Sequence, residues 1–280
     1  MLEEQIYIAD AAIATALYLS TVLGKPLLIE GPAGVGKTEI AKALANALQT
    51  RLIRLQCYEG LDATTALYEW NYPKQLLHLK LEESSSASET EKEAMIFSEA
   101  FLLKRPLLQA ITEHERAPVL LIDEIDRSDE EFEAFLLEVL SDYQVTIPEI
   151  GSIKATHRPH VVLTSNRSRD LSDALRRRCL YHWIDYPSLE KELEIVRAKV
   201  PAIEAGLAKR VTEVMQATRT MSLSKIPGVA ETLDWANALV ALKATRVSEE
   251  IVAETLGCFL KDESDVAAFK AELPRICTDV

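Results

Sequence analysis

The segment GPAGVGKT, residues 31–38, constrains the fold of this chain more than any other stretch. It follows the apolar run Leu27–Ile29, which is typical of a buried strand. It precedes EIAKALANAL, whose Ala and Leu residues favour a helix. The segment matches the pattern G-x-x-x-x-G-K-[ST] in full, and its place between a strand and a helix is the context that this pattern requires. The chain should therefore contain a strand, a glycine loop and a helix in immediate succession.

The glycine loop predicts binding of a nucleoside triphosphate, and ATP is favoured because no N-K-x-D guanine-reading motif occurs. Its glycines allow backbone angles that turn amide groups inward at a helix N-terminus. Lys37 would reach the β and γ phosphates, and the Thr38 hydroxyl would ligate Mg²⁺. A simple glycine turn before a helix is the alternative. The predicted nucleotide-binding residues are Gly31, Pro32, Ala33, Gly34, Val35, Gly36, Lys37, Thr38 and Glu39.

Polar residues end two further strand-like runs. Asp123 follows four apolar residues, so we expect it at the carboxyl edge of a parallel sheet, where it would orient Mg²⁺ and its waters. Glu124 would align or deprotonate the attacking water. An acidic pair at a helix N-terminus is the alternative for both. Asn166 would hydrogen-bond the attacking water or the γ-phosphate, although Asn is also a common loop starter.

The alternation of strands and helices predicts an α/β fold, a core with a parallel sheet and helices on both faces, followed by a small all-helical lid domain. The core is expected over residues 1–188, with an insertion around 56–98 and a hairpin around 143–160, and the lid over 189–280. The serine-rich segment 81–94 is expected to be a mobile loop tip. The predicted strands are 27–29, 52–55, 117–122, 160–166 and 180–184, and the predicted helices include 8–23, 189–199, 203–217, 228–243 and 249–261.

Charge and composition restrict the class of protein. The chain has 31 Lys and Arg against 44 Asp and Glu, a formal net charge of −13, which argues against a dominant role in nucleic-acid binding. Neither a secretory signal nor an apolar run long enough to span a membrane is present, so a cytoplasmic protein without membrane contact is expected. The 4 cysteines lie far apart, as expected of reduced thiols.

Three consecutive arginines, Arg176, Arg177 and Arg178, stand out in so acidic a chain. The first explanation is a solvated helix end, because cations are favoured at helix C-termini. A patch that binds nucleic acid is a second explanation, which no interleaved aromatic residues support. A third follows from the family that the chain resembles.

The chain resembles an AAA+ ATPase, with GPAGVGKT as Walker A, LLIDE at 120–124 as Walker B and Asn166 as sensor 1. Within AAA+ it is similar to the MoxR group, whose Walker B continues as D-E-x-x-R, here Asp123 to Arg127, and whose hairpin before sensor 1 looks like residues 143–166. The stretches LQCYEGLDATTALYEWNYPKQLL at 55–77 and AETLDWA at 230–236 resemble the CoxD-like branch, which is associated with maturation of molybdenum-containing carbon monoxide dehydrogenase.

The resemblance implies an ATPase that converts ATP and water to ADP and phosphate and assembles as a homo-oligomeric ring, a hexamer. In such rings an arginine of the neighbouring subunit reaches the γ-phosphate, and the position of the three arginines matches it; Arg177 and Arg178 are favoured over Arg176. The resemblance also implies a chaperone role in metal-centre assembly of a molybdenum enzyme, with a von Willebrand factor A domain protein as partner. A nucleic-acid motor or loader, and a nucleotide-gated interaction module with little turnover, are the alternatives.

The lid departs from the resembled family in one respect. A sensor 2 arginine is usual at the start of the third lid helix, yet residues 225–236 read KIPGVAETLDWA and contain no arginine. Either sensing through the lid is weak or Lys225 takes this role. Two other groups have more than one interpretation. His157 and His160 lack a third ligand and are expected to be ordinary hairpin residues, and Tyr68, Trp70 and Tyr72 either pack in the insertion or contact a client.

Overall fold

The computed structural model describes residues 7, 8, 10–81 and 88–279. It contains a five-stranded sheet with the strand order β2-β5-β8-β1-β9. The β2·β5, β5·β8 and β1·β8 pairs are all parallel. A parallel sheet flanked by helices, with a helical C-terminal part, confirms the predicted fold class. The strands are β1 (Leu27–Glu30), β2 (Leu52–Gln56), β5 (Val119–Asp123), β8 (His160–Ser165) and β9 (Leu180–Trp183).

The sheet forms because its inner strands are apolar on both faces. Every residue of β1 and of β5 is buried, including the terminal Glu30 and Asp123. Continuous apolar runs of this kind are typical of parallel strands covered by helices on both sides. The polar residues come last in each strand, so the parallel arrangement gathers them at the carboxyl edge of the sheet.

Local capping sets the bounds of the helices around the sheet. In α7, the Asp129 carboxylate accepts a hydrogen bond from the Phe132 amide at 2.8 Å, and three glutamates occupy the first turn. The helix stops at Tyr143, which adopts the left-handed conformation with φ 50°. The helices of this part are α1 (Ala11–Leu23), α2 (Lys37–Ala47), α6 (Pro106–Ile111), α7 (Glu130–Asp142) and α8 (Asp173–Arg178), with a 3₁₀ turn η3 (Ile125–Arg127).

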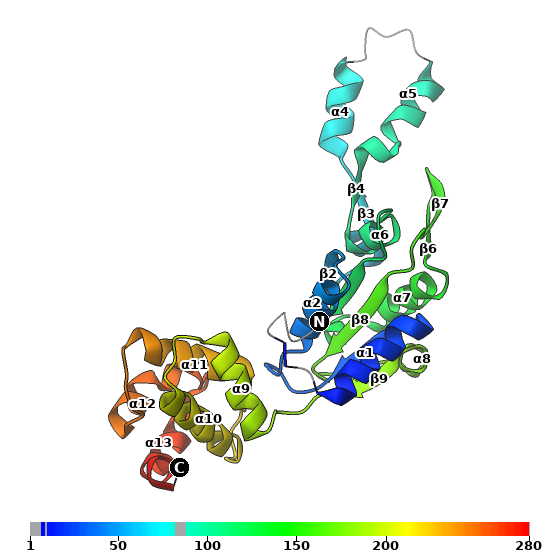
Figure 1. Ribbon diagram of the computed structural model, residues 1–280. Helices are drawn as coiled ribbons and strands as arrows, with labels where there is room; N and C mark the ends of the chain where they lie inside the picture. Colours follow the sequence, from blue (N-terminus) through cyan, green and yellow to red (C-terminus); the bar gives the residue numbers. More distant parts are fainter. Residues whose placement is uncertain (1–6, 9, 82–87, 280) are drawn as a thin grey trace. The chain divides into compact units, whose positions relative to one another are not determined.

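The insertion between β2 and β5 consists of a short antiparallel ribbon and a pair of helices that extends from it (Figure 1). Trp70 is buried and packs edge-on against Phe97 and Tyr68, whereas Tyr72 is 60% exposed. Trp70 therefore belongs to the core of the insertion. The elements are α3 (Ala63–Leu67), β3 (Tyr68–Trp70), α4 (Tyr72–Leu81), α5 (Glu89–Ile96), η2 (Glu99–Phe101) and β4 (Leu102–Lys104).

The expectation of a mobile loop over residues 81–94 is wrong for part of that segment. Residues 89–94 belong to helix α5, and residue 81 ends α4. Ser88 and Glu91 form a capping box: the Ser88 amide donates to Glu91 Oε2 at 2.8 Å, and the Glu91 amide donates to Ser88 Oγ at 3.3 Å. The S-x-x-E pattern favours a helix start here, although the polar composition of the segment predicts a loop. Residues 82–87 lie outside the described residues.

Strands β6 (Gln144–Ile147) and β7 (Gly151–Lys154) form an antiparallel hairpin that precedes β8 in the chain. Gly151 has φ +100°, a conformation that residues with a side chain rarely adopt, at the start of the returning strand. Burial lowers the pKa of His160, the first residue of β8. Among the residues that the structure describes, there is no group of three or more His, Cys, Asp or Glu side chains that could hold a metal ion.

The C-terminal part is a helical domain with its own apolar core around Trp235, Phe259 and Phe269. Its helices are α9 (Leu189–Lys199), α10 (Ala205–Arg219), α11 (Val229–Ala241), α12 (Glu249–Thr255) and α13 (Glu263–Asp279). Two expectations need correction. The helix expected over 249–261 ends at Thr255 and continues as a 3₁₀ turn, η4 (Leu256–Cys258), that contains Gly257, and α13 has no counterpart among the predicted helices.

Residues 31–40 pack with the helical domain, which begins at residue 183, as one compact unit, and residues 11–30 and 41–182 form a second unit. None of the described helices combines the length and the apolar character needed to cross a membrane.

Candidate nucleotide-binding and hydrolysis site

Two glycines of the loop adopt backbone angles of the predicted kind. Gly34 and Gly36 have φ of +74° and +92°, a region that residues with a side chain rarely adopt. Gly31 is required for a different reason, because a Cβ at this position would lie 2.1 Å from the main-chain oxygen of Ile184. Helix α2 begins at Lys37, so its N-terminal amides and the positive end of its dipole lie next to the loop. This arrangement favours a phosphate group.

Lys37 lies within the loop and is only 7% exposed. Its ammonium donates hydrogen bonds to the main-chain oxygens of Gly31 and Pro32 at 2.8 and 2.6 Å. In these two bonds the ammonium is held by neutral main-chain oxygens of the loop and not by a carboxylate. A phosphate oxygen is a stronger acceptor for an ammonium than a neutral carbonyl.

The N-terminus of α11 packs directly on the loop. The Ala230 amide donates to the Gly34 main-chain oxygen at 3.2 Å. A Cβ on Gly228 would lie 2.8 Å from both the Ala33 oxygen and the Gly34 Cα, so the two backbones touch and only glycine fits. Glu231 accepts from the Gly228 amide at 2.8 Å and caps the helix at this point. The helical domain thus contacts the phosphate loop through its main chain.

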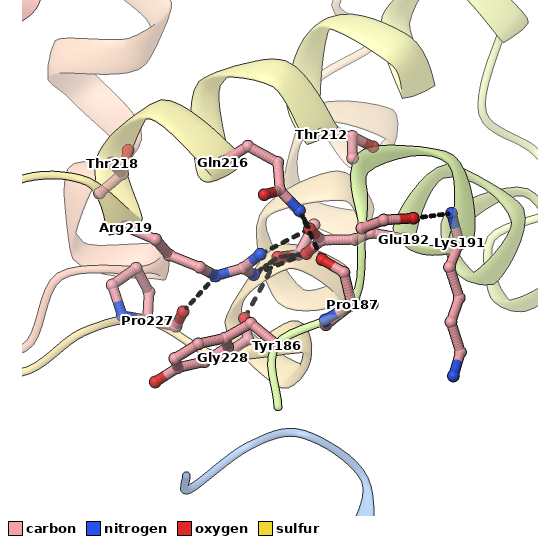
Figure 2. Close-up of polar contacts among 12 residues, drawn as sticks. Tyr186, Pro187, Lys191, Glu192, Thr212, Gln216, Thr218, Arg219, Pro227 and Gly228 are labelled. Carbon is pink, nitrogen blue, oxygen red and sulfur yellow. Dashed lines mark hydrogen bonds and ion pairs between the residues drawn. The ribbon is translucent and has the colours of Figure 1, made fainter. Parts of the chain in front are cut away.

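A buried polar cluster holds the turn before α11 (Figure 2). Arg219, at the end of α10, pairs with Glu192 of α9 through two contacts of 2.6 Å, and its Nε donates to the Pro227 oxygen at 2.8 Å. Thr232 donates to the same glutamate at 2.6 Å. The Arg219 guanidinium also lies over the ring of Tyr186, 5.1 Å from its centroid. Three helices are thereby fixed around the residues that contact the loop.

At the carboxyl edge of the sheet, Thr164 of β8 fixes the predicted acidic pair. Its hydroxyl donates to Asp123 Oδ1 at 2.5 Å and accepts from the Glu124 amide at 2.9 Å. Asp123 is 2% exposed, whereas the Glu124 side chain is 34% exposed. Glu124 has φ 56°, so the backbone turns sharply between the two acids and separates their environments. This backbone conformation is sparsely populated for a residue with a side chain.

Strand β2 contributes two residues that sequence reasoning missed. Arg54 donates twice to Asp123 Oδ2, from Nη2 at 2.6 Å and from Nε at 2.9 Å. Gln56 donates to Glu124 Oε2 at 3.0 Å, and Arg127 donates to the same oxygen at 3.2 Å. Both acids therefore have cationic or amide partners. Two polar side chains on one face at the end of an apolar strand were the available signal.

Asn166 follows β8, and its main-chain amide donates to Asp126 Oδ1 at 3.2 Å. Asp126 also accepts from the amide and the hydroxyl of Ser168, at 2.9 and 2.7 Å. Burial opposes ionisation of Asp126, but these hydrogen bonds outweigh it and lower its pKa. Asp126 therefore anchors the loop that carries Asn166, and the Asn166 side chain makes no hydrogen bond with the part of the chain that the structure describes.

The three arginines of α8 have different surroundings. Arg176 lies 3.7 Å from the buried Glu30 and over the ring of Tyr181. Arg178 donates to the Leu137 oxygen and to Ser141 Oγ at the end of α7. The Arg177 side chain is exposed and has no hydrogen bond or ion pair with any described residue. Arg178 is exposed as well, but its guanidinium is held by those two acceptors.

The two predicted magnesium ligands, Thr38 and Asp123, offer a hydroxyl and a carboxylate oxygen. Oxygen ligands suit Mg²⁺, which is usually bound by one or two protein groups together with phosphates and water. The two residues therefore fit a magnesium ion that is held mainly by a nucleotide. No cluster of three or more candidate ligands exists among the described residues.

Comparison with known proteins gives both a family and a fold. Residues 27–184 match the family described as "ATPase family associated with various cellular activities (AAA)". An uncharacterized protein of Staphylococcus haemolyticus is 25% identical over 96% of this chain and 97% of its own length. The RuvB subunit of the Holliday junction branch migration complex of Thermotoga maritima is 23% identical over 91% of this chain, which spans 65% of RuvB.

Solved structures of Thermotoga maritima RuvB have the same fold. One mutant form aligns with a TM-score of 0.52 at 22% identity, over 91% of this chain and 71% of the other. The structure described as the Holliday junction branch migration motor aligns with a TM-score of 0.51 at 21% identity, over 94% and 74%. The family match covers more than half of the sequence, including the glycine loop and the acidic pair. The chain belongs to the AAA family of ATPases.

Proposed function

We propose that the protein hydrolyses ATP with magnesium in a homo-oligomeric ring, a hexamer, and remodels a protein client. The observation that carries the hydrolysis is the acidic pair at the end of β5. Asp123 is buried and Glu124 is partly exposed, and Thr164 holds both at the carboxyl edge of the sheet. Two carboxylates with different environments suit two different roles, one at a metal and one at a water.

Each residue has a defined role in this proposal. Lys37 and the amides of the glycine loop bind the phosphates, and Thr38 and Asp123 would hold Mg²⁺. The bound ion neutralises charge on the phosphates. Glu124 orients and deprotonates the attacking water, and Asn166, whose side chain has no partner among the described residues, accepts or donates a hydrogen bond there. Arg177 enters the site of the neighbouring subunit and stabilises the charge that develops on the transferred phosphoryl group.

The client is the finer part of the proposal. We propose that the client is a molybdenum-containing dehydrogenase and that a von Willebrand factor A domain protein is a partner in its maturation. The support is a resemblance: the D-E-x-x-R pattern is similar to the MoxR group, and residues 55–77 are similar to its CoxD-like branch. The Walker B arginine of this pattern, Arg127, contacts Glu124. Copurification of the tagged chain with such a partner, from cells that express both, would test this part separately.

A nucleic-acid motor is the second candidate, because the fold matches that of a protein described as a branch migration motor. The net charge of −13 opposes it, since duplex binding depends on clustered cations. Binding of a labelled duplex at low and at high salt, with hydrolysis measured with and without DNA, decides between the candidates. Salt-sensitive binding together with DNA-stimulated hydrolysis would replace the protein client with DNA.

The first test is the rate of ATP hydrolysis against protein concentration. We expect the rate per subunit to rise cooperatively with protein concentration. Addition of the Glu124→Gln variant should lower the rate of the mixture below the value expected if the variant only diluted the active subunits. Glu124→Gln alone should keep ATP binding and lose roughly 10²-fold or more in hydrolysis. Glu131→Gln, an exposed acid in the first turn of α7, is the matched control. A negligible wild-type rate at every concentration would leave a nucleotide-gated module instead.

A further inference from the structure

A pocket that the nucleotide site does not use lies at the amino edge of the sheet. Its volume is about 300 Å³, at the lower end of the range of small-molecule sites. Pro26, Arg158 and Cys179 line it, and they precede β1, β8 and β9, which are neighbours in the sheet. The Leu180 amide donates to the Pro26 oxygen at 2.8 Å and joins two of these strand starts. The phosphate loop follows β1, so the pocket and the loop lie at different ends of this strand.

The charged side chains around this pocket are all cations. Lys25, Arg158 and Arg178 line it, and none of the described residues in its wall is an aspartate or a glutamate. Lys25 and Arg158 form no ion pair with the described part of the chain. Arg178 binds two neutral acceptors of α7 there. In a chain with a net charge of −13, three gathered cations without a carboxylate partner create a local attraction for an anion from outside.

The end of a helix accounts for one of these cations. Arg178 donates to the Leu137 oxygen near the C-terminus of α7. The side chains of Lys25 and Arg158 make no hydrogen bond to any carbonyl that the structure describes. Arg158 lies instead over the ring of Tyr143, with its Cζ 5.9 Å from the centroid. Both of these cations therefore keep their donors for a ligand.

Tyr143 is a buried polar residue in the wall of the pocket. It is 4% exposed, and its hydroxyl makes no hydrogen bond with the described residues. Buried polar groups are almost always hydrogen-bonded, so this phenol is available as a donor to a ligand. Burial raises the pKa of Tyr143, and it raises the pKa of Cys179 to about 12. Both groups are uncharged at neutral pH and would not repel an anion.

The same pocket has an apolar wall, which includes the buried Leu140 and Leu175. We propose that it binds a small organic anion. The apolar body of the ligand lies against the leucines, and its phosphate or carboxylate group is held by Lys25, Arg158 and the Tyr143 hydroxyl. A guanidinium presents its donors in a fork that matches the oxygens of either group. This inference is independent of the proposed function.

The first test is isothermal titration calorimetry of the full chain with three aromatic probes. Phenyl phosphate and phthalate carry the two kinds of anionic group on a similar apolar body, and benzamide is neutral. We expect at least one anion to bind and benzamide not to bind, and the tighter anion identifies the preferred group. Equal binding of benzamide would mean that the pocket does not recognise charge, which overturns the inference. Failure of both anions to bind at millimolar concentrations overturns it as well.

Charge variants locate the bound anion. Lys25→Gln and Arg158→Gln should each weaken binding about two- to fivefold, as expected for charges that stay partly solvated. Arg246→Gln, which removes another exposed cation without an ion pair in the described chain, is the matched control. Wild-type affinity in both pocket variants would place the anion elsewhere. Loss of binding in Lys37→Met would place it at the phosphate loop, and either result overturns the inference.

The second test is NMR with tyrosine-selective ¹³C labelling. The ring signals of Tyr143 and Tyr72 are assigned by their loss in Tyr143→Phe and Tyr72→Phe. The Tyr143 signal should shift as phenyl phosphate or phthalate is added, and that of Tyr72, exposed on the insertion, should not. A Tyr143 signal that stays in place at saturation would show that the anion binds elsewhere. These measurements use no nucleotide, so a protein that hydrolyses ATP but binds neither anion loses this inference alone.

Discussion

Arg219 and Glu192 form a two-point ion pair inside the helical domain, with both contacts at 2.6 Å and side chains that are 6% and 0% exposed. A third donor of Arg219 binds the main-chain oxygen of Pro227, next to the glycine that packs on the phosphate loop. The pair thus connects the interior of the helical domain to the turn that touches the loop, where this chain lacks the expected arginine.

Replacement of Arg219 by Leu should therefore destabilise the protein strongly. Removal of one partner leaves a buried, uncompensated carboxylate, which costs about 3–5 kcal/mol. Denaturant unfolding would measure it, with Arg275→Leu as the control, because the pair of Arg275 with Glu272 is exposed. A loss below about 1 kcal/mol would show that Glu192 finds other compensation.

Gly228→Ala tests the contact with the phosphate loop. The new Cβ would lie 2.8 Å from main-chain atoms of Ala33 and Gly34, so the loop or the helix must shift. We expect ATP affinity to fall about tenfold or more, together with about 1–3 kcal/mol of stability. Gly206→Ala, where no atom lies within 4 Å of the new Cβ, should leave affinity unchanged. Equal affinities in both variants would mean that the loop adjusts freely.

Lys37→Met should abolish detectable ATP binding. The variant loses the ammonium that binds the Gly31 and Pro32 oxygens and that would contact the phosphates. Isothermal titration calorimetry would measure binding directly. Lys42→Met removes an exposed lysine of the same helix and serves as the comparison. Wild-type affinity in Lys37→Met would contradict the assignment of the loop.

Arg177→Ala should reduce hydrolysis by about 10³-fold or more and keep ATP binding, if this side chain acts across a subunit interface. Arg178→Ala should instead lower the melting temperature, because Arg178 binds the end of α7 within its own chain. Steady-state hydrolysis, binding and thermal unfolding separate the two. Normal hydrolysis by Arg177→Ala, in a sample that behaves as an oligomer, would remove Arg177 from the mechanism.

His160 should make the stability depend on pH. Burial lowers the pKa of the folded state below the ordinary 6.5, so the unfolded chain binds the proton first as pH falls. The contribution of His160 to the free energy of unfolding is present above pH 6.5. It is lost as pH falls through the pKa of His160 in the folded state, at up to about 1.4 kcal/mol per pH unit. His160→Gln should remove this slope from the urea-derived free energy of unfolding, and His157→Gln should keep it. Parallel slopes for both variants would exclude His160 as the source.

The sequence determined the phosphate loop, the parallel sheet and the position of the acidic pair, because each depends on local pattern. Glycine, lysine and apolar runs specify their own backbone conformation and burial, and Asp123 directly follows such a run. The capping box at Ser88 was equally local, and a helix there could have been expected.

The partners of the acids were decided by the tertiary structure. Arg54 and Asp123 are 69 residues apart in the chain, and Thr164 lies 41 residues beyond Asp123. They meet because β2, β5 and β8 pair in parallel register, which follows from packing of the whole sheet rather than from any one segment. The contact of Gly228 with Gly34 has the same origin, since it depends on how α9, α10 and α11 pack around one buried ion pair.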